Sequence, residues 1–180
     1  MELKLPAATE KQLREFVSVM QQARLILKDP ERKYTDQFKG FRKVVIMGIV
    51  LIIIQIIMMS TGRMTGFLQF LMGCTLIMTG LAILSLIAMN KNLKNLINTS
   101  GPTSLNLSPV EIEHVSSQGD KITIPWANVK FIRIFDEMMT FFPYNPHGVL
   151  FAISTEYAPV VLDYMQNNNI NIHLIAGEKK

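Results

Sequence analysis

Two long apolar runs, residues 44–59 and 64–89, stand four residues apart, and neither contains a charged residue. As helices they would be roughly 24 and 39 Å long, against a membrane hydrocarbon core of about 30 Å. The first helix would span the hydrocarbon core only if the residues after it extend the helix. The second is longer than the core is thick, so it must tilt in the membrane or protrude from it. Because four residues cannot carry a chain back across a bilayer, the pattern predicts an antiparallel transmembrane hairpin over residues 44–90, with spans of about 44–60 and 64–89.

Small or polar residues recur along both predicted spans with a spacing of seven. They are Gly48, Gln55 and Gly62 on the first span, and Gly66, Gly73 and Gly80 on the second. This spacing keeps residues on one seam of a left-handed helix pair, where glycine lets the backbones approach closely. We expect the two rows to face each other, with a hydrogen bond between Gln55 and Gln69. A polar path through the membrane is the alternative, but no intramembrane charge supports it.

The first 43 residues form a basic arm that contains one amphipathic helix. Thr9 and Gln12 have the spacing of a capping box at a helix N-terminus. Along one side of the predicted helix then come Leu13, Phe16, Val17, Met20, Arg24 and Leu27, and Asp29-Pro30 ends it. This stripe has three alternative partners: the membrane surface, the C-terminal domain or a second copy of the chain. Because Arg24 interrupts the stripe, we favour packing on the C-terminal domain.

Residues 101–180 show the pattern of a small β-rich domain. Short segments with alternating or β-branched residues, separated by turn-forming residues, predict strands at 104–107, 110–115, 121–124, 129–135, 138–142 and 149–154. A helical pattern follows at 156–167, and residues 170–175 form a last candidate strand. The predicted fold class is therefore a membrane protein of the α+β type, with a two-helix hairpin and a small β-rich domain closed by a C-terminal helix.

Charge is distributed unevenly along the chain. Residues 1–43 carry ten Lys and Arg against six acidic residues, whereas residues 91–180 carry seven against eight. Six basic residues lie at 28–43 and Lys91 and Lys94 follow the second span, while the turn between the spans has only Arg63. The positive-inside rule then places both termini in the cytoplasm of a protein of the cell membrane. A nucleic-acid-binding protein would carry its positive charge on the folded domain, so this class is disfavoured.

One segment resembles a known family. Residues 120–132, Asp-Lys-Ile-Thr-Ile-Pro-Trp-Ala-Asn-Val-Lys-Phe-Ile, end one strand in Pro-Trp and begin another after a short turn. Together with the preceding 105–112 segment and the later helix, this order resembles the YcxB-like family and related bacterial membrane-anchored proteins with a pleckstrin-homology-like (PH-like) domain. The resemblance covers residues 40–167. It implies a PH-like fold over residues 101–180 and a scaffold or binding role.

Three aromatic residues are candidates for a partner interface. Trp126 is the only tryptophan, and its alternative role is a core anchor beneath the sheet. Phe142 and Tyr144 belong to a Pro-containing loop that has the aromatic content of a membrane or partner contact. For Phe142 the alternative is again a place in the core.

The sequence contains no recognisable catalytic, cofactor or metal motif. His114, His147 and His173 lie on separate elements, and no Gly-rich phosphate loop or nucleophile motif occurs. We therefore expect a non-enzymatic membrane protein in contact with lipid, which presents its domain to a protein partner or forms a homo-oligomer, with no nucleic acid bound. The alternative is an accessory subunit of a transporter or export complex, bound through the hairpin.

Overall fold

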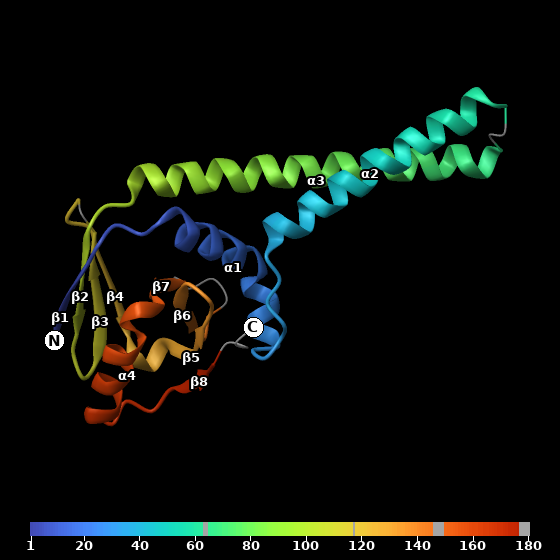
Figure 1. The fold of residues 1–180 in the computed structure, drawn as a ribbon. Coiled ribbons are helices and arrows are strands. Elements are labelled where there is room, and N and C mark those ends of the chain that lie inside the picture. The colour runs from blue at the N-terminus through green and yellow to red at the C-terminus, as the bar shows by residue number, and fades with distance from the viewer. Residues whose placement is uncertain (63–64, 117, 146–149, 177–180) are drawn as a thin grey trace. The chain divides into compact units, whose positions relative to one another are not determined.

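The computed structural model describes residues 1–62, 65–116, 118–145 and 150–176 (Figure 1). Met64, His147 and Val149, which belong to predictions made above, lie outside these ranges. The chain is of the α+β type, with two long apolar helices and a small sheet domain. It divides into two compact units, one of Met1–Tyr34 with Asn95–Lys180 and one of Thr35–Lys94. The arm predicted as one segment over 1–43 is thus shared between the two units.

A strand from the very N-terminus completes the first sheet. Strands β1 (Glu2–Leu5), β2 (Thr103–Leu107), β3 (Glu111–Val115) and β4 (Lys121–Pro125) pair antiparallel in that order. Leu3 lies opposite Leu105, and the N-terminal amine of Met1 donates a hydrogen bond to the Leu107 carbonyl at 2.7 Å. The helix of the arm and both apolar helices therefore lie, in sequence, between two neighbouring strands.

The second sheet contains one parallel pair. Its strands are β5 (Val129–Ile134), β6 (Met138–Pro143), β7 (Phe151–Ser154) and β8 (His173–Ile175), in the order β7-β6-β5-β8, with β8 parallel to β5. A 3₁₀ turn, η1 (Trp126–Asn128), links the two sheets. Another, η2 (Thr155–Tyr157), leads into helix α4 (Ala158–Asn167). These elements confirm the six predicted strands, the predicted helix and the last candidate strand, with shifts of a few residues at their ends.

The main hydrophobic core lies between the two sheets and is closed by α4 (Figure 1). Leu105 comes from the first sheet, Ile132 and Met139 from the second, and Val161 from α4, and none of them is exposed to solvent. Alternation along each strand directs these side chains to one face of their sheet. The apolar side of α4 closes the core because its buried residues, Ala158, Val161 and Met165, recur at helical spacing.

Helix α1 (Glu10–Lys28) covers the other face of the second sheet. Val19 and Ile26 of α1 pack with Phe131, Phe135 and Phe142, and the rings of Phe131 and Phe142 stack with centroids 4.7 Å apart. Strand β6 is consequently buried on both faces. The helix of the arm therefore packs on the C-terminal domain, as we favoured.

The face of α1 that packs on the sheet differs from the predicted stripe. Leu13 and Val17 are buried as predicted, but Met20 is 51% exposed and Arg24 is exposed. Polar residues take their place on the buried face, namely Glu15, Ser18 and Gln22. The prediction was wrong in part because it counted only apolar side chains, whereas backbone N–H groups of Glu137 and Met138 provide partners for the buried Glu15.

Polar interactions hold α1 at both ends. The Glu15 carboxylate accepts hydrogen bonds from the backbone N–H groups of Glu137 and Met138, at 2.8 and 2.9 Å. At the other end, Lys130 donates to the Leu27 carbonyl at 3.1 Å and Arg133 donates to the Pro30 carbonyl at 2.7 Å. Lys130 thus meets a carbonyl of the last helical turn, at the negative end of the helix dipole, and Arg133 meets a carbonyl just beyond the helix. Burial raises the pKa of Glu15 above its usual value, although the two N–H groups oppose this shift.

The second unit contains one long apolar helix and most of another, and most of their apolar side chains are exposed. Helix α2 (Gln37–Ser60) begins after Asp36, whose carboxylate caps the first turn, and α3 (Gly66–Thr99) follows a turn in which Gly62 has a φ of +68°. Their 24 and 34 residues correspond to about 36 and 51 Å. Only 11% of the residues in the most apolar stretch of each helix are buried. Both helices are long and apolar enough to cross a membrane.

Candidate functional site: a helix seam and a pocket beside the sheets

The two apolar helices are in close contact at Gly48. A Cβ atom placed there would lie 3.0 Å from Thr79 Cβ and closer still to Thr79 Oγ1, so only glycine fits without a shift. The Thr79 hydroxyl donates to the Thr75 carbonyl at 2.7 Å, which holds the side chain in place. Gly48 and Gln55 are both buried, as the spacing of seven predicts for α2.

The predicted partner row on α3 is wrong. A Cβ atom at Gly66, Gly73 or Gly80 would have nothing within 4 Å among the described residues, and the same is true of Gly62 in the turn. Thr79 and Ala82 are buried on α3 instead. Since adjacent helical residues are about 100° apart, Thr79 at the seam turns Gly80 away from α2. Gln69 is exposed, and Gln55 Oε1 has no hydrogen-bond partner among the described residues, so the predicted bond between the two amides is also wrong.

Two of the three aromatic candidates belong to the interior of the domain. Trp126 is buried, and its Nε1–H donates to the Ser108 carbonyl at 2.8 Å, so the indole anchors η1 against the core. Phe142 is fully buried beneath α1. Their predicted role as partner contacts is replaced by the core role that was the alternative for each. Tyr144 is 64% exposed, and its role as a contact stays a prediction.

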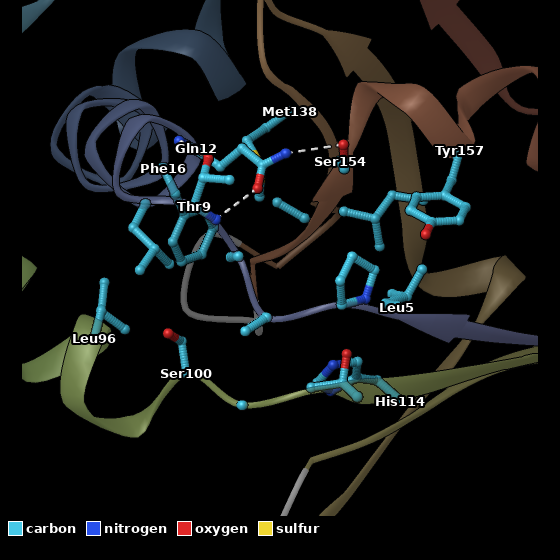
Figure 2. Close-up of a pocket in the computed structure, with 18 of the residues that line it drawn as sticks. Leu5, Thr9, Gln12, Phe16, Leu96, Ser100, His114, Met138, Ser154 and Tyr157 are labelled. Carbon is cyan, nitrogen blue, oxygen red and sulfur yellow. Dashed lines mark hydrogen bonds between the residues drawn. The ribbon is translucent and has the colours of Figure 1, made fainter.

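A pocket of about 320 Å³ lies within the first unit, beside strand β7 (Figure 2). Four parts of the chain line it: residues 5–16, the end of α3 and the following residues 96–103, strand β3 with Ser116, and residues 152–157 with Met138. The N-terminal segment between β1 and α1 forms one wall because β1 and α1 belong to different layers. No single stretch of the sequence could have revealed this pocket.

Most polar groups of the pocket are already engaged. The Gln12 amide donates to the Ser154 hydroxyl at 2.9 Å and accepts from the Thr9 N–H at 2.8 Å, as Figure 2 shows. The hydroxyls of Thr99 and Ser100 donate to carbonyl groups of the last turn of α3. These bonds shape the wall of the pocket and leave few polar groups for a ligand.

His114 is one of the exceptions. Strand alternation places it on the same face as the buried Ile112, so its ring points to the interior and lies 5.2 Å from the Phe151 ring. Its ring nitrogens have no hydrogen bond to any residue that the structure describes. The sequence offered one signal for this position: a histidine two residues after an isoleucine on an alternating strand.

Burial lowers the pKa of His114 below its usual value of 6.5, because the charged ring would lose its hydration. The unfolded chain therefore binds a proton more readily than the folded domain. We expect the free energy of unfolding to be largest above pH 6.5 and to fall as the pH drops from 6.5 through the lowered pKa.

The measurement is chemical denaturation at a series of pH values, followed by the fluorescence of Trp126. The matched variant is His114→Phe, which keeps a ring but cannot be protonated. Glu15 and the other titrating groups are unchanged in this variant, so the difference between the two profiles isolates His114. Parallel profiles below pH 6.5 would contradict the assignment.

Comparisons with known protein families, with curated proteins and with solved structures found no match to this chain.

Proposed function

We propose that this protein is a non-catalytic integral membrane protein, in which the α2–α3 hairpin crosses the membrane and carries a cytoplasmic binding domain. The observation that supports this most strongly is the exposure of the helices. Met47, Phe67 and Phe70 are each more than 60% exposed, in stretches without a charged residue. A soluble monomer rarely exposes a contiguous apolar surface of this extent to water, because its hydration is unfavourable. The hydrocarbon of a membrane would cover the same surface without this penalty.

The domain supports a binding role through its construction. It has its own hydrophobic core, and both ends of α1 are tied to the second sheet. Two sheets joined at Trp126 and closed by a helix agree with the order of elements in the YcxB-like and PH-like resemblance, and we propose membership of that group on this basis. Such a domain would present its surface, including the exposed Tyr144, to a protein partner or to a second copy of the chain.

The topology predicts a specific labelling pattern. In a variant whose only cysteine, Cys74, is replaced by serine, a cysteine at Thr61 lies in the turn between the helices and one at Asn167 lies at the end of α4. A membrane-impermeant maleimide should label Thr61→Cys in intact cells and Asn167→Cys only after the cells are permeabilised. The basic residues before α2 give the reason, since they favour the cytoplasmic side. Labelling of Asn167→Cys in intact cells would contradict the orientation.

A second candidate function is that of an accessory subunit of a membrane transporter or export complex, bound through the hairpin. The open row of Gly66, Gly73 and Gly80 favours it, because small residues at this spacing allow a helix of another chain to approach closely. Exchange of residues 44–89 for an unrelated hairpin would distinguish the two functions. A partner that binds the domain would still be recovered after the exchange, whereas a partner of the hairpin would be lost.

A further inference from the structure

The pocket beside β7 has the size and lining of a ligand site. Its volume of about 320 Å³ lies at the lower end of the range for small-molecule pockets. At about 30 Å³ per water-sized group, it has room for roughly ten such groups. Apolar side chains, among them Leu5, Phe16 and Leu96, line it (Figure 2). A short hydrocarbon chain is therefore a suitable occupant.

The charge of the pocket restricts the head group of such a ligand. Among the described residues that line it there is no Lys or Arg, and Glu156 carries the only formal charge, which is negative. A phosphate or carboxylate would find no cationic partner here and would be repelled by Glu156. A neutral head group meets no such penalty, and it can bond to the ring nitrogens of His114, one of which donates and the other of which accepts when the ring is neutral.

The position of the pocket indicates where the ligand comes from. Leu96 and Ser100, which line it, belong to the last turn of α3 and the residue after that helix. Leu96 lies only two residues beyond Lys94 in the same helix, and Lys91 and Lys94 mark the point at which α3 would leave the membrane in the proposed function. At 1.5 Å per residue, Leu96 is about 8 Å along the helix from Lys91.

We propose that this pocket binds a neutral amphiphile with a single hydrocarbon chain of about ten carbons or fewer, drawn from the membrane. The chain occupies the apolar space between the N-terminal segment and the end of α3, and the uncharged polar head bonds to His114. The source of the ligand rests on the proposed function, because it requires α3 to leave the lipid close to the pocket.

Photolabelling of the full-length protein in phosphatidylcholine nanodiscs tests the proposal. The probe is a ten-carbon primary alcohol with a diazirine on its chain, and labelled peptides are identified by mass spectrometry. We expect label in residues 5–16 and 152–157, and separately in the two apolar helices, which contact lipid. Unlabelled decan-1-ol should compete with the label in the domain. The matched anionic probe, with a carboxylate in place of the hydroxyl, should label the domain several-fold less.

Two variants separate occupation of the pocket from partitioning into lipid. Leu96→Trp fills the space and should reduce labelling of the domain by about tenfold, equivalent to about 1.4 kcal/mol of binding, while labelling of the hairpin is unchanged. Ile97→Trp is the control, because Ile97 is the next residue of α3, is exposed and does not line the pocket. His114→Leu should reduce labelling of the domain about fivefold, as expected for one lost hydrogen bond.

The outcomes distinguish failure of this inference from failure of the proposed function. Label in the hairpin without label in the domain would overturn the pocket assignment and leave the membrane function standing. Equal labelling of the domain in wild type and Leu96→Trp, or by the alcohol and the carboxylate, would also overturn it. Label in the domain without label in the hairpin would support the pocket but contradict insertion of α2 and α3 into lipid.

Discussion

Replacement of Glu15 by alanine is expected to lower the free energy of unfolding of the domain by about 2–4 kcal/mol. The carboxylate of this buried residue accepts from two backbone N–H groups, those of Glu137 and Met138. Alanine would leave both donors without this partner beneath α1. A buried donor such as the Met138 N–H costs about 1–3 kcal/mol when it loses its acceptor, and the partly buried Glu137 N–H costs less. The measurement is denaturation of the full-length protein, followed by the fluorescence of Trp126.

Two control variants define the cause of this loss. Glu15→Gln keeps an acceptor oxygen in the same place, and because a neutral bond is about half as strong as a charged one, it should lose less than half as much as alanine. Glu10→Ala removes an exposed carboxylate from the first turn of the same helix and should change stability by less than about 1 kcal/mol. Equal losses for Glu15→Ala and Glu10→Ala would show that the carboxylate does not hold α1 to the sheet.

Replacement of Gly48 by leucine is expected to weaken the pairing of α2 with α3 by about 3 kcal/mol or more. The first carbon of the new side chain would already overlap Thr79, and the bond from Thr79 to the Thr75 carbonyl keeps its side chain from moving away. Gly73→Leu is the matched control. It places the same side chain in open space and should change stability by less than about 0.5 kcal/mol.

The measurement is titration of the protein with sodium dodecyl sulfate in mixed micelles, with energy transfer between fluorophores on α2 and α3 as the signal for pairing. A double variant identifies the contact. Gly48→Ala should weaken pairing, and addition of Thr79→Ala should recover most of the loss because it removes Oγ1, which is the nearest atom to the new methyl group, together with Cγ2, and leaves only Cβ at 3.0 Å. Similar effects of Gly48→Leu and Gly73→Leu would exclude Thr79 as the contact.

Local patterns were sufficient for most of the secondary structure. The apolar runs predicted α2 and α3, the capping box and Asp29-Pro30 predicted both ends of α1, and the alternation in residues 101–180 predicted the strands. These predictions succeeded because helices and strands present their side chains with periods that depend only on neighbouring residues. The same reasoning identified Gly48 and Gln55 as the buried seam of α2.

Tertiary contacts decided where those elements meet. Strand β1 has four residues and finds its partner β2 about a hundred positions later, so no local pattern could predict the pairing. The glycine row on α3 was displaced from the seam by a single residue, since one step along a helix rotates a side chain by about 100°. The buried face of α1 includes polar as well as apolar side chains, and among them the Glu15 carboxylate accepts from two backbone N–H groups beside the second sheet.

The sequence by itself thus determined the main elements other than strand β1, their order and the two helices that suit a membrane, because each depends on composition and period within one segment. Only the tertiary structure decided which face of α1 is buried, which residue of α3 meets Gly48, and that segments within residues 5–16, 96–103, 114–116 and 152–157 line one pocket. These features depend on distances between segments that are far apart in the chain, and such distances are set by how the layers pack together.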